Sequence, residues 1–72
     1  MGRRQTRRIG AAVRARRMQL GLSQVFVARA VGMSQQALCD IEKGRYNPSL
    51  EVMPRLAAAL QVRVEDLLTD SA

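Results

Sequence analysis

The segment between Gln24 and Ile41 constrains the fold most, because it places small and apolar residues at fixed intervals. Ala28 lies four residues after Gln24, and Gly32 lies eight residues after it. The apolar residues Leu38 and Ile41 follow at fourteen and seventeen residues. Two helices that meet at a sharp angle need a small residue where they pass closest, and a glycine that can take positive φ at the turn. The spacing therefore predicts two short helices joined by a tight turn.

Apolar residues elsewhere recur with the period of a helix, and no stretch alternates with period 2 for long, so we expect an all-α fold. Gly21 is expected to end the first helix, and Ser23 and Ser34 are expected to cap the second and third. The five expected helices cover residues 7–20, the segment from Ser23 to Gly32, the segment from Ser34 to Gly44, residues 50–60 and residues 64–68.

The start of the fourth helix depends on Pro54. A helix that begins at Leu50, capped by Ser49, would lose one hydrogen bond at Pro54 and would bend. A helix that begins near Met53 would hold Pro54 in its first turn, where its missing N–H does no harm. We expect an irregular or kinked start.

The length and the single cysteine indicate one small domain in a reducing compartment. The 72 residues suffice for one domain, and Cys39 alone cannot form an internal disulfide. No apolar run approaches the ~20 residues that cross a membrane, and residues 1–8 lack the apolar segment of a signal peptide. We therefore expect a cytoplasmic protein with a flexible basic arm over residues 1–8, a domain over residues 9–68 and a frayed end over residues 69–72.

Positive charge is concentrated in the first half of the chain. Twelve Lys and Arg stand against six Asp and Glu, a net charge of +6, and eight of the arginines fall within residues 1–29. Such an imbalance predicts a polyanionic partner, either nucleic acid or an anionic membrane surface. A membrane-surface protein needs a helix with a broad exposed apolar face, which this sequence lacks. Nucleic acid is therefore the expected partner.

The elements LSQ, Ala28, Gly32, Ser34, IEKG and NPSL follow one another from Leu22 through the segment SQVFVARAVGMSQQALCDIEKGRYNPSLEVMPRLAAALQVRVEDLL. In that order they make residues 9–68 resemble the helix-turn-helix domain of the lambdoid phage repressor and Cro family. This family is also called the xenobiotic-response-element family of bacterial regulators. The resemblance implies a five-helix, lambda-repressor-like fold in which the second and third helices form the helix-turn-helix, and it implies binding to double-stranded DNA.

The resemblance also implies that the third helix enters the major groove and meets base edges with its first residues. Gln35 and Gln36 match the paired glutamines of some phage repressors, and a glutamine amide can accept from adenine N6–H and donate to adenine N7. The alternative is that both are ordinary polar residues at a helix start. Asp40 departs from those repressors, which carry another glutamine there. We expect Asp40 either to accept from a cytosine amino group or to be held by a nearby arginine.

Further polar residues are expected at the DNA backbone. The candidate phosphate contacts are Gln24, Ser34, Lys43, Arg45, Tyr46 and Asn47. By resemblance Gln24 also supports the third helix, while Tyr46 could equally pack across its own loop, and capping alone explains Ser34. The arginines of the arm either contact phosphates or belong to a solvated tail; they are Arg3, Arg4, Arg7 and Arg8.

Two further positions are interpreted through the resemblance. Arg17 and Glu42 stand where the helical pattern requires inward residues, and the matching pair in phage repressors forms an internal salt bridge. We therefore expect Arg17 to be structural rather than a DNA contact. Phe26 occupies a position that is usually polar in this family, so it either covers the core or forms a surface for a partner.

The expected function is that of a sequence-specific transcriptional regulator, which binds a near-palindromic operator as a homodimer. One small subunit offers few base contacts, so a dimer is expected. Its interface is expected on the fourth and fifth helices, at Val62, Arg63, Val64 and Leu67. Activators of this family often present acids on the second helix, and residues 23–31 contain none. Repression by blocking polymerase is therefore expected first.

Two other functions stay open, and several are not expected. The small size also resembles restriction–modification controller proteins, which both activate and repress. The chain could instead be a protein-interaction module, such as an antitoxin or adaptor, with Phe26 and the fifth helix as its surface. Catalysis, metal and cofactor sites are not expected, because the chain has no histidine, one cysteine and no Gly-rich phosphate loop. A small-molecule effector is not expected either, because the sequence shows no second domain that could bind one.

Overall fold

The computed structural model describes the backbone of residues 3–68 and the side chains of residues 8–68. These residues form five α-helices and no strand. The helices are α1 (Arg3–Gln19), α2 (Gln24–Val31), α3 (Gln35–Glu42), α4 (Val52–Ala59) and α5 (Val64–Leu68). The all-α, five-helix fold expected from the sequence is confirmed.

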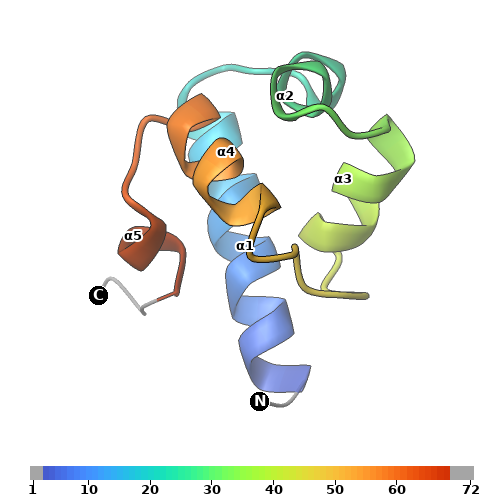
Figure 1. Cartoon of the computed structure of the whole chain (residues 1–72), viewed down its shortest axis with the longest axis vertical. Coiled ribbons are helices and arrows are strands. Elements are labelled where there is room, and N and C mark those ends of the chain that lie inside the picture. The colour runs from blue at the N-terminus through green and yellow to red at the C-terminus, as the bar shows by residue number, and fades with distance from the viewer. Residues whose placement is uncertain (1–2, 69–72) are drawn as a thin grey trace.

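The helix pair α2 and α3 forms the outer part of the molecule, and the other helices support it. In Figure 1 the long helix α1 runs up the view, with α2 and α3 on its right and α5 on its left. α1 packs against α3 and α5, while α2 packs against α3 and α4. The pair is therefore held from behind by two other helices, and one face of α3 is left to solvent.

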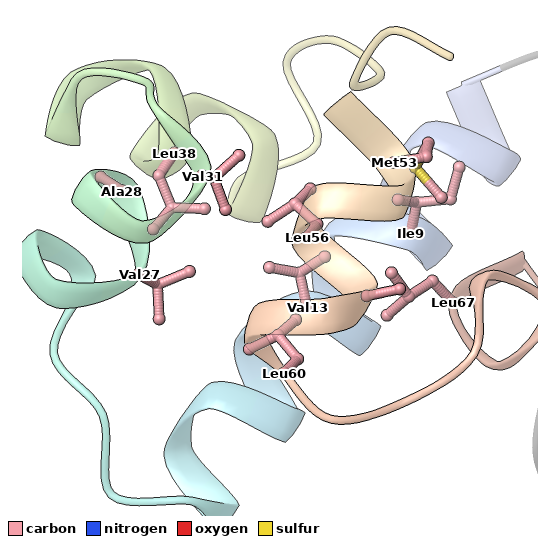
Figure 2. Packing of buried hydrophobic residues seen from close by; sticks show 11 residues of the cluster. Ile9, Val13, Val27, Ala28, Val31, Leu38, Met53, Leu56, Leu60 and Leu67 are labelled. Carbon is pink, nitrogen blue, oxygen red and sulfur yellow. The ribbon is translucent and has the colours of Figure 1, made fainter. Parts of the chain in front are cut away.

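The core is a single cluster of aliphatic side chains to which every helix of the described region contributes (Figure 2). Its buried members are Ile9, Val13, Val27, Ala28, Val31, Leu38, Met53, Leu56, Ala57, Leu60 and Leu67. A domain of this size removes only about 60% of its unfolded surface from water, so its stability depends on a small number of such contacts.

The caps expected at α2 and α3 are confirmed. The hydroxyl oxygen of Ser23 accepts from the Phe26 N–H at 3.0 Å, and that of Ser34 accepts from the Ala37 N–H at 3.0 Å. At the turn between the two helices Gly32 takes φ +88°, which L side chains rarely adopt. The Gly32 N–H donates to the Ala28 carbonyl at 2.9 Å, so the turn closes with the last carbonyls satisfied.

The irregular start expected for α4 is also found. The Ser49 carbonyl accepts from the N–H groups of both Val52 and Met53 at 3.0 Å, and the Ser49 hydroxyl accepts from the Val52 N–H at 3.2 Å. Leu50 is part of this turn rather than of the helix. Pro54 therefore lies in the first turn of α4, where no helical N–H is required.

The start of α1 differs from the prediction. The helix begins at Arg3 rather than near Arg7, so the backbone of residues 3–8 is helical. The role of this segment as an arm that contacts DNA stays a prediction. The physical reason is that residues 3–9 contain no proline or glycine and are rich in arginine, a good helix former, so nothing stops the helix. The frayed end predicted over residues 69–72 lies outside the described residues, as do the side chains of Arg3, Arg4 and Arg7.

Gly10 lies where the backbones of α1 and α3 come very close together, a contact that no motif in the sequence predicted. A Cβ built on Gly10 would collide with the carbonyl oxygen of Ile41 and would lie 3.0 Å from that of Glu42. Both obstacles are backbone atoms, which cannot turn aside as a flexible side chain can. The available signal was a glycine inside a helical apolar pattern, which often has a packing reason.

We expect Gly10→Ala to lower the free energy of unfolding by about 1–3 kcal/mol, because the added methyl must separate α1 from α3. Helix propensity alone predicts the opposite sign, a gain of about 1 kcal/mol. Urea unfolding of the two proteins measures the difference. The matched control is Ala11→Gly at the exposed neighbouring position, which should cost about 1 kcal/mol through propensity alone. A Gly10→Ala protein more stable than the parent would refute the close approach.

We expect Gln61→Gly to raise the free energy of unfolding by about 0.5–1 kcal/mol. Gln61 follows α4 with φ +59°, in the left-handed region that glycine occupies at other helix ends of this protein. The turn itself is well bonded, since the Val62 N–H donates to the Ala57 carbonyl at 3.0 Å. Thermal unfolding measures the gain. Gln61→Ala keeps a Cβ and is the control; an equal gain from both variants would show that φ is not the cause.

Candidate nucleic-acid interface

α3 separates its residues into a buried face and an exposed face, as successive residues turn by about 100°. Leu38, Ile41 and Glu42 are buried, whereas Gln35 and Gln36 at the first turn are exposed. The sequence pattern predicts this separation correctly for the apolar residues and for the paired glutamines. The exposed first turn therefore carries two amide side chains, each able to donate and accept hydrogen bonds.

Glu42, the last residue of α3, is buried and is paired with Arg17 of α1. The carboxylate accepts from Arg17 Nε at 2.7 Å and from Arg17 Nη2 at 3.1 Å. Glu42 is only 8% exposed, and Arg17 also donates to the Leu22 carbonyl at 2.8 Å. The hydrogen bond to Glu42 and its negative charge raise the pKa of Arg17 above its ordinary value, although burial opposes them. The salt bridge expected between these residues is present, and it ties α3 to α1.

Gln24 connects this ion pair to the exposed face of α3. Its Nε2 donates to Glu42 Oε1 at 3.1 Å, and its Oε1 accepts from Gln35 Nε2 at 3.5 Å. A carboxylate has no hydrogen to donate, so only the Nε2 end of Gln24 can face Glu42. The support that Gln24 was expected to give the third helix therefore has a physical basis, while its phosphate contact stays a prediction.

Asp40 lies one turn after Gln36, and two donors meet on one of its oxygens. Gln36 Nε2 donates to Asp40 Oδ1 at 3.0 Å, and Arg45 Nη1 donates to the same oxygen at 3.1 Å. Of the two roles expected for Asp40, the arginine partner is therefore present. A contact with cytosine stays a prediction.

The remaining phosphate candidates lie on the surface around α3. Lys43 and Asn47 are exposed, and Ser34 caps the helix as described. The Tyr46 hydroxyl donates to the Ala37 carbonyl at 3.2 Å, which is the contact across the loop that was expected as one of its two roles. Arg8 is exposed on α1. Contacts of these residues with phosphate stay predictions.

The surface predicted for a second subunit needs one correction, at Leu67. This side chain is 1% exposed and belongs to the core, so it cannot lie in an interface. Adjacent residues of a helix point about 100° apart, and because α5 turns Leu67 inward, Leu68 is 38% exposed in its place. Val62 and Val64 are half-buried and Arg63 is exposed, so these three keep accessible surface.

Phe26 projects from α2 into solvent. It is 57% exposed, so it does not cover the core, which was one of its two expected roles. Val25 beside it is exposed as well. These two residues form a small apolar area on the outer side of α2.

Two absences hold for the residues that the structure describes. None of their helices is both long enough and apolar enough to span a membrane. Within the same residues, no three His, Cys, Asp or Glu side chains gather as a group that could hold a metal ion.

A family model described as helix-turn-helix (HTH_3) matches residues 13–67, which is most of the chain. The chain therefore belongs to this helix-turn-helix family of transcriptional regulators, whose members bind double-stranded DNA and are not typically enzymes. The resemblance stated from the sequence is confirmed.

Two relatives illustrate the similarity in sequence. An HTH-type transcriptional regulator of Methanothermobacter thermautotrophicus is 43% identical over 56 residues, which cover 76% of this chain and 81% of the relative. The immunity repressor protein of Bacillus phage phi105 is 37% identical over 60 residues. That match covers 83% of this chain but 42% of the repressor, which is a longer protein.

Solved structures agree with the fold over most of the chain. The restriction-modification controller protein C.AhdI from Aeromonas hydrophila superposes with a TM-score of 0.82 at 31% identity, covering 86% of this chain and 94% of that one. The clp gene regulator ClgR from Corynebacterium glutamicum gives a TM-score of 0.84 at 32% identity, covering 88% of this chain and 67% of that one. The five-helix fold is thus shared with known regulators.

We expect Arg17→Met to lower the free energy of unfolding by about 3–5 kcal/mol, because the Glu42 carboxylate would stay buried without its cation. The free energy of unfolding of a small domain is only about 5–15 kcal/mol in total, so this loss should be evident in thermal and urea unfolding. The double variant Arg17→Met/Glu42→Leu removes both charges and should recover most of the loss. Full thermal stability in Arg17→Met alone would show that the pair is not structural.

Proposed function

We propose that the protein is a sequence-specific regulator that binds a near-palindromic operator as a homodimer, with α3 in the major groove of each half-site. The observation that carries the proposal is the pair of exposed amides, Gln35 and Gln36, on the first turn of α3. In helix-turn-helix proteins the first residues of the second helix of the motif meet base edges.

The dimensions and dipole of α3 support this placement. Its eight residues span about 12 Å, which is close to the width of the major groove. Its N-terminal N–H groups carry partial positive charge, and Ser34 satisfies one of them while the helix start stays exposed. Such a terminus favours phosphate oxygens nearby.

The charges around α3 are compatible with a polyanion. Its two acids are both paired, Glu42 with Arg17 and Asp40 with Arg45. The exposed cations Lys43 and Arg45 follow the helix, and the whole chain has a net charge of +6. The net positive charge supplies affinity for DNA of any sequence. The two acids of α3 add little repulsion, because each is paired with an arginine.

Two copies are proposed because one copy cannot span both half-sites. The longest dimension of one subunit is 27 Å, whereas recognition helices on successive major grooves lie about 34 Å apart. The proposed interface lies at the end of α4 and on α5, with Val62, Arg63 and Val64 at its centre. Leu68 adds exposed apolar surface to the same region.

Repression by covering a promoter is the proposed outcome of binding, and one alternative has specific support. The immunity repressor of phage phi105 is related over 83% of this chain. The controller protein C.AhdI matches over 94% of the length of its solved chain. A controller that both activates and represses is therefore the second candidate.

A protein-interaction module, such as an antitoxin or adaptor, is the candidate of a different class. Exposed Phe26 and Val25 on α2 favour it, since neither is needed for the core. The two classes differ in what they predict for DNA. A regulator distinguishes sequences, whereas an adaptor shows only weak, salt-sensitive association with any duplex.

Selection of bound duplexes from a random pool, followed by anisotropy titrations at two salt concentrations, tests the proposal. We expect one near-palindromic sequence to be enriched and bound about 10³-fold or more above random DNA. Gln35→Ala and Gln36→Ala should each lose about 1–3 kcal/mol of discrimination at one base pair of each half-site.

The matched control is Lys43→Ala, which should weaken binding to all sequences alike and lower the slope of log affinity against log salt by about 1. Sedimentation of the complex should give two chains per site. Enrichment of no sequence would refute the regulator and favour the adaptor. One chain per enriched site would refute the dimer alone.

A further inference from the structure

The hydrogen bond between Gln36 and Asp40 has a direction that chemistry fixes. Gln36 Nε2 donates to Asp40 Oδ1 at 3.0 Å. An ionised carboxylate only accepts hydrogen bonds, so the amide cannot turn its oxygen towards Asp40 without losing this bond. The Nε2 end of Gln36 therefore faces Asp40, and its Oε1 is turned away from that carboxylate.

Asp40 is itself held in place by Arg45. The Arg45 guanidinium donates to the same Oδ1 at 3.1 Å, and the Arg45 backbone N–H donates to the Asp40 carbonyl at 2.9 Å. The Asp40 side chain is 23% exposed, so packing also restricts it. The acceptor that orients Gln36 thus has little freedom of its own.

This arrangement limits what Gln36 can offer to a base. A glutamine amide has two N–H donors and one acceptor oxygen, and Asp40 engages one of the donors. One donor and one acceptor remain. Adenine presents an N6 amino donor and an N7 acceptor in the major groove, which match that pair. Guanine presents two acceptors, N7 and O6, and therefore requires two donors from the protein.

We propose that Asp40 is a positioning residue that makes Gln36 select adenine over guanine, by engaging one of the two amide N–H groups. The inference rests on the proposed function, in which the first turn of α3 meets base edges. Asp40 acts through Gln36 and touches no base in this arrangement. Arg45 offsets the negative charge that Asp40 would otherwise turn towards the phosphates.

The test uses the full chain and the duplex enriched from the random pool. The base pair read by Gln36 is identified as the one whose discrimination is lost in Gln36→Ala. Affinities are then measured for duplexes with adenine or guanine at that pair. The parent protein should prefer adenine by about tenfold or more. Asp40→Ala should reduce the preference to less than about threefold, since the whole amide can then turn towards the base.

Two control variants separate the acceptor from the charge. Asp40→Asn keeps an oxygen that can accept from Gln36 and Arg45, so it should keep the adenine preference although the charge is gone. Arg45→Ala keeps the Asp40 carboxylate as the acceptor for Gln36, so it should weaken binding to both duplexes by the same factor. Circular dichroism confirms that each variant is helical; alanine favours the helix at position 40.

The possible failures are distinguishable. An equal change of both affinities in Asp40→Ala would show that Asp40 only stabilises the helix or repels phosphate, and would overturn the inference. Loss of a cytosine preference at another base pair would show that Asp40 reads a base itself. Either of these results would leave the proposed function as a DNA-binding regulator standing. Enrichment of no sequence by the parent protein would overturn the proposed function, and the inference with it.

Discussion

The buried carboxylate of Glu42 is the group on which the position of α3 depends. It accepts from Arg17 of α1 and from Gln24 of α2, and so joins three helices at one point. Burial of a charge is costly, and only well-placed partners offset the cost. Any shift of α3 relative to α1 or α2 would lengthen these bonds while the charge stayed buried. The pair therefore contributes less to stability than to a single, defined arrangement of the three helices.

The packing behind α3 acts in the same direction. At Gly10 the backbone of α1 approaches the Ile41 carbonyl so closely that a methyl group has no room. Ala28 is buried on α2 within the core cluster, so both neighbours of α3 use small residues. Base contacts require side chains to be held within about 0.5 Å of the productive geometry. Backbone contacts between helices provide such a support better than long side chains do, because they have no rotamers to change.

The features that sequence predicted are those fixed by local chemistry. The caps at Ser23 and Ser34 and the turn at Gly32 follow from hydrogen bonds within a few residues, so the pattern determines them. The start of α1 was missed because no stop signal precedes it, and a helix without one continues. Leu67 was misplaced because two adjacent leucines are alike in sequence, and only the tilt of α5 decides which one is buried. The direction of the Gln36 amide follows from its hydrogen bond to the Asp40 carboxylate, one turn further along the same helix.

Two acids on the helix that is proposed to face DNA are unexpected in so basic a chain, and their partners suggest a reason. Attraction between arginines and phosphates is largely blind to sequence, whereas recognition of bases requires hydrogen bonds with a direction. Each acid fixes such a direction: Asp40 orients Gln36, and Glu42 orients Gln24, which accepts from Gln35. Each is also neutralised by an arginine, Arg45 or Arg17. The net charge of +6 provides electrostatic attraction to DNA over the whole chain. In the proposed complex the two acids weaken that attraction slightly at α3, and in return they hold the amide side chains in defined orientations.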